Sequence, residues 1–414
     1  MESREARPLS FDRRSLLVGG VTIFGGMALL GRSARAGSDP SNGERKSEAA
    51  PRTLLLVELN GGNDGLSCIV PHGDDIYFRS RSRVGVARED VLKIDDYRGF
   101  HPNLTALRKL YDERKLAIVE GTGYPNPNHS HFSSQDIWHT ARATGRASGD
   151  GWIGRLIAAL YADDVQIPHA VHVGQTLPYS LKSSTHPVVC FDSPPAYRWA
   201  ANADAIARDG MTDTGEAAKR SPLAQIRSVV RNAKQSSEDV RRAAASYVPR
   251  VEYPNEPFAQ DLKVAAALLQ SRIGCRVLSV TQQGYDTHED QKRRHDLLMN
   301  DLDAALSAFF EDVRGTEAGD NILVLAFSEF GRRVEDNASM GTDHGTAGPM
   351  FLLGTKVSGG LYGQHPSLAN LFEGDLIHTT DFRSVYASAI ERWFGLDSQP
   401  ILGGKYAPIQ GVLA

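Results

Sequence analysis

The chain has 414 residues, of which 41% are hydrophobic and 23% are charged, and its formal net charge is −4. This composition is globular and provides enough apolar residues for one large domain or two ordinary ones. The mildly acidic balance disfavours nucleic acid and anionic membrane surfaces, so we expect neither as a partner.

Residues 1–36 have the organisation of an export signal. Arg13-Arg14 precede an uncharged stretch, Ser15 to Gly31, and Ala34-Arg35-Ala36 offers a small-x-small cleavage site. The segment Ser10 to Leu17 resembles the twin-arginine motif of bacteria, and a general secretory signal with a chance arginine pair is the alternative. We expect a signal peptide, the twin-arginine export machinery as a partner, and a periplasmic or extracellular location.

Residues 37–52 are polar and rich in Ser, Pro, Gly and charge, which indicates a flexible linker. No later apolar run is long enough to span a membrane, so we expect no stable span in the mature chain. Residues 53–414 are predicted to form a single domain.

The first predicted strand, Thr53 to Leu59, is apolar at nearly every position, as is typical of a strand buried on both faces. It runs into Asn60-Gly61-Gly62-Asn63-Asp64-Gly65, where the glycines allow close backbone approach. We therefore place Asn60 and Asp64 at the carboxyl end of this strand. An ordinary turn built from Asn, Asp and Gly is the alternative.

A second strand is predicted at Lys115 to Glu120, followed by a Pro, Asn and Gly loop and then a helix that begins near Ser130. A loop that leads into a helix N-terminus is a natural anion site. Ser130, His131 and Ser133 lie there and are the candidate catalytic residues. A helix is predicted at 150–162, a short strand at 170–173, and a charged, helical outer subregion at about 200–250.

Helix and strand continue to alternate along the rest of the chain, with helices at 258–273 and 295–310 and strands at 276–280 and 322–327. This alternation predicts an α/β fold, a three-layer α/β/α sandwich with a mainly parallel central sheet. Ligand sites in such sheets lie outside the carboxyl ends of the strands. The three cysteines, Cys68, Cys190 and Cys275, have no zinc-binding spacing.

Two late strand ends carry acids and histidines, namely Asp286 and His288 after one, and Glu329, Asp343 and His344 after the other. Carboxylate and imidazole ligands together suit zinc or manganese, and carboxylate-rich sites suit magnesium or calcium. We therefore predict a divalent metal site from these five residues with Asn60 or Asp64 beside them. Charge compensation by Arg332 or Arg333, and acids that are merely hydrogen-bonded, are the alternatives.

Six motifs together resemble a bacterial family of exported proteins of unknown function, which is related to the alkaline phosphatase and sulfatase superfamily. The motifs are VELNGGNDG, GYPNPNHSHFSSQDIW, GYDTH, SEFGR, GTDHG and TTDFRSVY, spread over Thr53 to Leu396. The resemblance implies an alkaline phosphatase-like sandwich with two metal ions at strand ends beside a nucleophile.

The resemblance also implies roles for individual residues. Asn60 stands where the first strand's metal-binding Asp is expected, Asp286 and His288 resemble the Asp and His of one metal site, and His344 resembles the late metal-binding His. Glu329 and Phe330 occupy the positions of an Asp-His pair, and the nucleophile should lie near Ser130 to Ser133. Because Asn60 and Phe330 depart from the pattern, a one-metal site or an inactive site stays open.

Two functions follow from these observations. The first is an exported metal-dependent hydrolase that acts on phosphate or sulfate esters of an unknown small molecule or polymer. The second is a non-catalytic envelope protein that binds a ligand in a degenerate hydrolase cleft. A serine hydrolase of the α/β-hydrolase type is disfavoured because the chain has no Gly-x-Ser-x-Gly motif.

Overall fold

The computed structural model describes residues 51–143, 148–162, 169–198, 222–271 and 273–413, and the side chains of 222–232 are outside this description. The predicted signal peptide at 1–36 and nearly all of the predicted linker at 37–52 lie outside the described residues, as do 199–221 of the charged subregion. These assignments, and that of one domain over 53–414, stay predictions. Within the described ranges, no helix combines the length and apolarity needed to cross a membrane.

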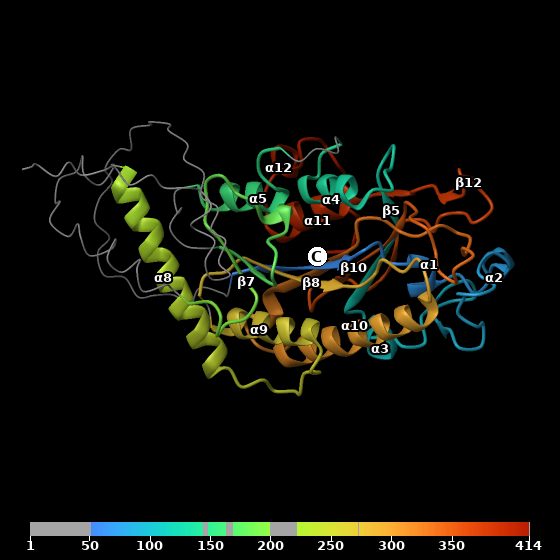
Figure 1. The fold of residues 1–414 in the computed structure, drawn as a ribbon, viewed down its shortest axis with the longest axis horizontal. Helices are drawn as coiled ribbons and strands as arrows, with labels where there is room; N and C mark the ends of the chain where they lie inside the picture. The colour runs from blue at the N-terminus through green and yellow to red at the C-terminus, as the bar shows by residue number, and fades with distance from the viewer. Residues whose placement is uncertain (1–50, 144–147, 163–168, 199–221, 272, 414) are drawn as a thin grey trace, which may run out of the picture.

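A central sheet runs through the molecule, with helices on both faces (Figure 1). Its strands lie in the order β11 (Gly360–Tyr362), β5 (Leu116–Gly123), β10 (Gly348–Leu353), β9 (Ile322–Phe327), β1 (Thr53–Asn60), β8 (Val277–Gln283), β6 (Ala170–Val173) and β7 (Val188–Phe191), and β14 (Thr380–Asp381) pairs with β5.

The sheet is mainly parallel, which confirms the predicted fold class. Strand β1 pairs in parallel with β8 and with β9, so the carboxyl ends of these three strands open on one edge. Strand β10 is antiparallel to both of its neighbours, β5 and β9, so β5 runs in the same direction as β9. The strands predicted at 53–59, 115–120, 170–173, 276–280 and 322–327 all lie in this sheet.

Alternate residues of β1 face two separate hydrophobic clusters. Leu55 and Val57 pack into the cluster that contains α3 (Thr105–Asp112), α8 (Pro222–Ser246), α9 (Pro257–Ser271) and α10 (Gln291–Val313). Leu54 and Leu56 pack into the cluster that contains α4 (His131–Thr140), α5 (Trp152–Leu160), α11 (Phe382–Ser388) and α12 (Ser398–Leu402). Because both faces are covered, the strand is apolar almost throughout.

Smaller elements surround the edge of the sheet where its parallel strands end. Two short helices follow β1, α1 (Gly65–Cys68) and α2 (Asp75–Ser80). A small sheet is formed by β2 (Ile69–Val70), β4 (Gly99–Phe100) and β3 (Leu92–Lys93), and a hairpin by β12 (Leu371–Phe372) and β13 (Asp375–Leu376). Figure 1 shows β12, α1 and α2 at one end of the molecule and α8 at the other.

Candidate metal centre

The turn after β1 brings its backbone against two other segments of the chain. Gly61 has φ +119°, and a Cβ there would lie 2.4 Å from the backbone N of Asp286. Gly62 has φ +78°, and a Cβ there would lie 2.2 Å from the ring of Phe330. Only glycine fits both the conformation and the space, so this turn lets Asp286 and Phe330 approach the end of β1.

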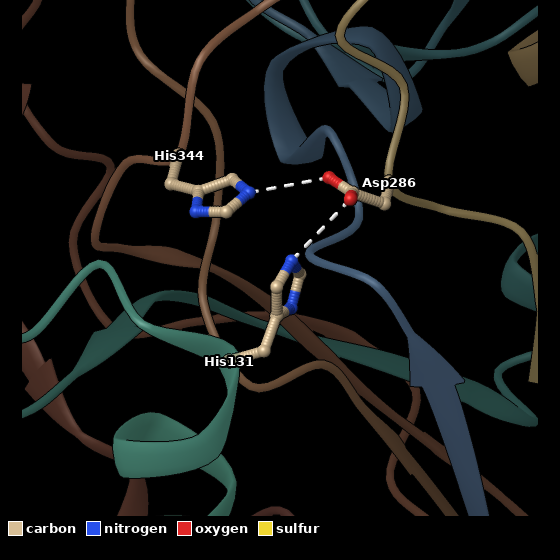
Figure 2. A group of neighbouring side chains, drawn as sticks. All are labelled: His131, Asp286 and His344. Atoms are coloured by element: carbon tan, nitrogen blue, oxygen red, sulfur yellow. Dashed lines mark hydrogen bonds and ion pairs between the residues drawn. The ribbon is translucent and has the colours of Figure 1, made fainter.

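Three side chains from distant segments converge beside this turn (Figure 2). His131 begins α4, Asp286 follows β8, and His344 lies between β9 and β10. Nε2 of His344 is 3.2 Å from Oδ1 of Asp286, and Nε2 of His131 is 3.5 Å from Oδ2. One ligand atom from each residue lies within 4.8 Å of the others, a spacing that a single metal ion can bridge.

His288 lies next to this group. Its Nε2 lies 2.9 Å from Nε2 of His344 and 3.2 Å from Oδ1 of Asp286. Three imidazole Nε2 atoms therefore lie within 3.5 Å of the Asp286 carboxylate, and imidazole and carboxylate ligands together suit zinc.

The other nitrogen of each imidazole is bound to an oxygen that can only accept a hydrogen bond. Nδ1 of His131 donates to Oε1 of Glu329 over 2.9 Å, Nδ1 of His344 donates to the carbonyl of His129 over 2.6 Å, and Nδ1 of His288 donates to Oδ1 of Asp343 over 3.3 Å. A neutral imidazole has one N–H, so each Nε2 presents a lone pair. This arrangement of outer partners is the one that metal-binding histidines show.

The positions of these nitrogen and oxygen atoms favour a bound cation over direct hydrogen bonds among the side chains. Nε2 of His131 is buried and has no hydrogen-bond partner among the described residues. Nε2 of His288 and Nε2 of His344 lie 2.9 Å apart, and because each ring donates from its Nδ1 to an oxygen, their lone pairs face each other. A carboxylate and several lone pairs at such distances repel unless a positive charge lies between them, so the residues present fit a divalent metal ion.

The pKa values of His131 and His344 are shifted in opposite directions. The hydrogen bond to Glu329 raises the pKa of His131, whereas burial lowers the pKa of His344. His344 is therefore neutral near pH 7 and keeps its Nε2 lone pair available.

An aromatic ring forms the floor under these imidazoles. Phe330 is buried, and its ring centroid lies 4.9 Å from that of His131 and 4.7 Å from that of His344. Phe330 has no ligand atom, so it positions two of the imidazoles by packing.

A buried arginine neutralises part of the negative charge. Arg332 donates from Nη2 to Oδ1 of Asp286 over 2.8 Å, and its side chain has no exposed surface. Burial acts to raise the pKa of Asp286, but the hydrogen bond from Arg332 and the Arg332 charge outweigh it and lower the pKa to about 2. Arg332 thus compensates one carboxylate, as the alternative reading of the sequence expected.

Two further carboxylates near the site are held ionised by hydrogen bonds. Glu329 is buried, which acts to raise its pKa, but the hydrogen bond from His131 and other contacts lower it. A hydrogen bond from Asn337 and others lower the pKa of Asp343. With Asp286, three ionised carboxylates therefore lie around the site, and Arg332 is hydrogen-bonded to one of them. Among the described residues, no second group of three donor side chains is gathered in this way.

The structure places the other predicted ligands outside the converging group. Glu329 accepts a hydrogen bond from Nδ1 of His131, and Asp343 accepts one from Nδ1 of His288. Each carboxylate therefore lies on the side of its imidazole that is opposite to Nε2. Asn60 is set apart, with its side-chain oxygen 3.4 Å from Nε2 of Gln135.

The environment of Asp64 contradicts our expectation that this carboxylate could supply a negative charge to a metal ion at the site. It is fully buried, and it accepts two hydrogen bonds from Arg81 and one each from Ser67 and Gln291. Its charge is thus neutralised by Arg81. No local pattern pairs Asp64 with Arg81, which lies 17 residues later.

The candidate serines are close to the site in sequence but are not arranged as nucleophiles. Ser130 occupies the N-cap position of α4, and its side chain is exposed. Ser133 is half-buried in the first turn of the helix. In the described part of the chain, neither hydroxyl is hydrogen-bonded to a base that could activate it.

Two residues that support the site were not singled out from the sequence. Nδ2 of Asn337 donates to Oδ1 of Asp343 and to the carbonyl of His288, and so holds both. Asp375 is buried and accepts a hydrogen bond from Nε2 of His129 over 2.6 Å. Asn337 lies in the loop between β9 and β10, and Asp375 begins the two-residue strand β13. Asn, Asp and Gly are common in and beside such loops for conformational reasons alone, so no local signal distinguished these two residues.

Residues 115–403 match the model of a family described as a protein of unknown function, DUF1501. The chain belongs to the DUF1501 family. The matched range includes His131, Asp286, His288 and His344, so the whole candidate metal centre lies within it. No curated protein matches the chain.

Solved structures similar to this DUF1501 protein include a sulfatase, a protein in the alkaline phosphatase superfamily and a lipoteichoic acid synthase. The PsFucS1 sulfatase from Pseudoalteromonas sp. is 11% identical, covering 88% of this chain and 72% of its own, with a TM-score of 0.40. A protein in the alkaline phosphatase superfamily from Vibrio parahaemolyticus is 10% identical, covering 77% and 64%, with a TM-score of 0.34. The lipoteichoic acid synthase LtaP from Listeria monocytogenes is 9% identical, covering 75% and 67%, with a TM-score of 0.34.

Proposed function

We propose that this DUF1501 protein is a hydrolase of phosphate or sulfate esters that depends on one divalent metal ion, with zinc as the preferred ion. The observation that carries the proposal is the convergence of three imidazole Nε2 atoms on the Asp286 carboxylate, with every Nδ1 fixed by an oxygen acceptor. Three imidazole ligands favour zinc over magnesium and calcium, which prefer oxygen.

Some residues of the chain would bind the metal ion, and others would orient the residues that bind it. His131, Asp286, His288 and His344 would bind the ion, which supplies Lewis-acid chemistry and lowers the pKa of a bound water. Glu329 orients His131 and increases its basicity, and Asp343 does the same for His288. Arg332 fixes one oxygen of Asp286, so the other is free for the ion.

The attacking group is proposed to be water rather than a serine. Ser130 and Ser133 have no base within hydrogen-bonding distance among the described residues. The Asp286 carboxylate is 49% exposed and the side chain of His288 is 43% exposed, so solvent reaches this side of the site.

Metal analysis of the purified protein, with a screen of phosphate and sulfate esters, tests this proposal. We expect one zinc ion per chain and its loss in His344→Ala, whereas Arg333→Gln, a half-exposed neighbour, should keep it. Hydrolysis by a metal-free protein would contradict the metal assignment and give His288 or His344 the role of general acid.

A non-catalytic binding protein is the second candidate function. It is favoured by Phe330, which offers no ligand, and by the two serines that lack a base. A protein that holds one metal ion but hydrolyses no ester in the screen would support this alternative over the hydrolase.

Export is proposed on the sequence alone, from Arg13-Arg14 and the uncharged stretch after them. Replacing both arginines with lysine should leave uncleaved precursor in the cytoplasm. Normal amounts of mature protein in the periplasm from that variant would refute the twin-arginine route.

A further inference from the structure

Six large hydrophobic side chains are strongly exposed within the described residues, and four of them belong to three segments that border the candidate metal centre. The four are Phe132, Met340, Phe372 and Ile377. Single exposed apolar residues are ordinary, but apolar residues gathered around one site mark a binding surface.

Phe132 directly follows the proposed ligand His131 on the first turn of α4. Its side chain is 83% exposed although it is aromatic. Because the ring is exposed, it contributes almost no free energy of apolar burial to the fold of this chain.

Met340 lies in the loop that holds His288. Its carbonyl accepts a hydrogen bond from the backbone N of Gln291, the first residue of α10, and Asn337 in the same loop donates to the carbonyl of His288. Next to it, a Cβ at Gly341 would lie 2.1 Å from the backbone of His288, so the loop packs closely on that ligand. The Met340 side chain is 56% exposed.

Phe372 lies in the β12–β13 hairpin and Ile377 directly follows it. Two hydrogen bonds connect this hairpin to the metal centre. Asp375 in β13, which pairs with Phe372, accepts from the ring of His129, and the carbonyl of His129 accepts from Nδ1 of His344. This third segment is therefore fixed to a proposed ligand, as the other two are.

The loop that contains Met340 and the turn between β12 and β13 each contain a residue in an unfavourable backbone conformation. Met340 has φ +58°, and Glu373, next to Phe372, has φ +54°. The left-handed region is uncommon for residues other than glycine, and such residues cluster at functional sites. The exposed positions of Met340 and Phe372 are thus set by hydrogen-bonded turns rather than by loose chain.

We propose that Phe132, Met340, Phe372 and Ile377 form an apolar rim that binds the non-reacting part of the substrate, so that the substrates are esters of apolar aryl or alkyl alcohols. The inference rests on the proposed function, because the rim is argued from its position around the metal centre. The occupant is a single dissolved molecule rather than a lipid bilayer. The chain is net acidic, which disfavours an extended anionic membrane surface, whereas a single ester brings only one anionic group to the metal ion.

Binding of n-alkylphosphonates of increasing chain length to the zinc-loaded protein, followed by isothermal titration calorimetry, tests the rim without requiring turnover. Each methylene that the rim covers should lower Kd up to about fourfold. Phe132→Ser and Met340→Ser should each weaken this dependence on chain length and leave the affinity for methylphosphonate unchanged.

Val248→Ser is the matched control, because Val248 is also 83% exposed. It lies beside Tyr247, whose hydroxyl bonds Asp312 at the far end of the 23-residue helix α10, about 30 Å from the end that carries the metal-site loop. This variant should bind the whole series as the wild type does.

The outcomes separate this inference from the catalytic proposal. Chain-length-dependent binding without hydrolysis of any ester would support the rim and refute the hydrolase. Equal affinity across the series, loss of the dependence in Val248→Ser, or no binding of any phosphonate would overturn the rim. Binding only to vesicles that contain a phosphate lipid, and not to dissolved phosphonates, would also overturn it and make this face a membrane contact.

Discussion

Arg332 and Asp286 are joined by a hydrogen bond of 2.8 Å that links the buried side of the candidate metal centre to its open side. The other N–H groups of Arg332 donate to backbone carbonyls of four residues: Gly61, Gly62, Tyr285 and Thr342. One guanidinium therefore fixes the turn after β1, the segment after β8 and the loop before β10. The geometry of the site depends on this contact as much as on the ligands themselves.

Arg332→Met should destabilise the protein by about 3–5 kcal/mol, because it leaves buried carbonyls without donors and Asp286 without its cation. The change is measured as the shift in free energy of unfolding in urea. Arg333→Met is the control, since Arg333 is half-exposed and lies 3.7 Å from Asp375, a contact worth about 1 kcal/mol or less. Equal effects of the two substitutions would contradict the role assigned to Arg332.

Much of the fold could be predicted because β1, β8 and β9 are apolar runs long enough to identify from local pattern alone. The position of β10 could not be predicted. The local sequence of Gly348 to Leu353 does not indicate that this strand runs antiparallel between β5 and β9. The helix predicted from Asn202 is described only from Pro222 onward.

The site was predictable as a set of residue types but not as a ligand assignment. Asp286, His288 and His344 each follow a strand, so their shared edge follows from the parallel sheet. Whether Glu329 faces the ion or the back of His131 depends on the path of Ser328 and Glu329 after β9, where both Glu329 oxygens accept from the backbone N of Gly61. Such contacts join residues more than 200 positions apart and have no local signature.

Glu329→Gln should lower zinc affinity by about 10- to 100-fold, because an amide orients His131 less well and removes a negative charge behind it. Competition with a chromophoric chelator measures the affinity. Glu335→Gln is the control, since Glu335 is exposed on the same loop. If the two variants bound zinc equally well, Glu329 would not support the site.

Asp64→Asn should remove part of the acid sensitivity of the fold. Burial acts to raise the pKa of Asp64, but Arg81 outweighs it and holds the folded-state pKa below its unfolded value of about 3.9. A lowered folded pKa gives stability that is present above pH 3.9 and is lost as the pH falls toward the folded pKa. The wild type should therefore exceed Asp64→Asn by about 3–5 kcal/mol at pH 7, with the difference narrowing below about pH 4.

Urea denaturation at several pH values measures this difference. Asp75→Asn is the control, because its partner Arg88 and Asp75 itself are both exposed, and it should lower stability by about 1 kcal/mol or less at any pH. A gap between wild type and Asp64→Asn that stayed constant from pH 7 to pH 3 would show that Asp64 does not titrate with the fold.

Ser130→Ala distinguishes water from serine as the attacking group. If water attacks, the variant should keep kcat within about tenfold of wild type, because Ser130 is an exposed N-cap whose hydroxyl lacks a side-chain capping bond. If Ser130 attacks, a covalent intermediate must form on it, and the substitution should lower kcat by several orders of magnitude. Asp286→Asn, which weakens metal binding in both cases, is the reference for full loss. Transfer of the phosphoryl group to an added alcohol, present in wild type and absent in Ser130→Ala, would show that the serine and not water is the nucleophile.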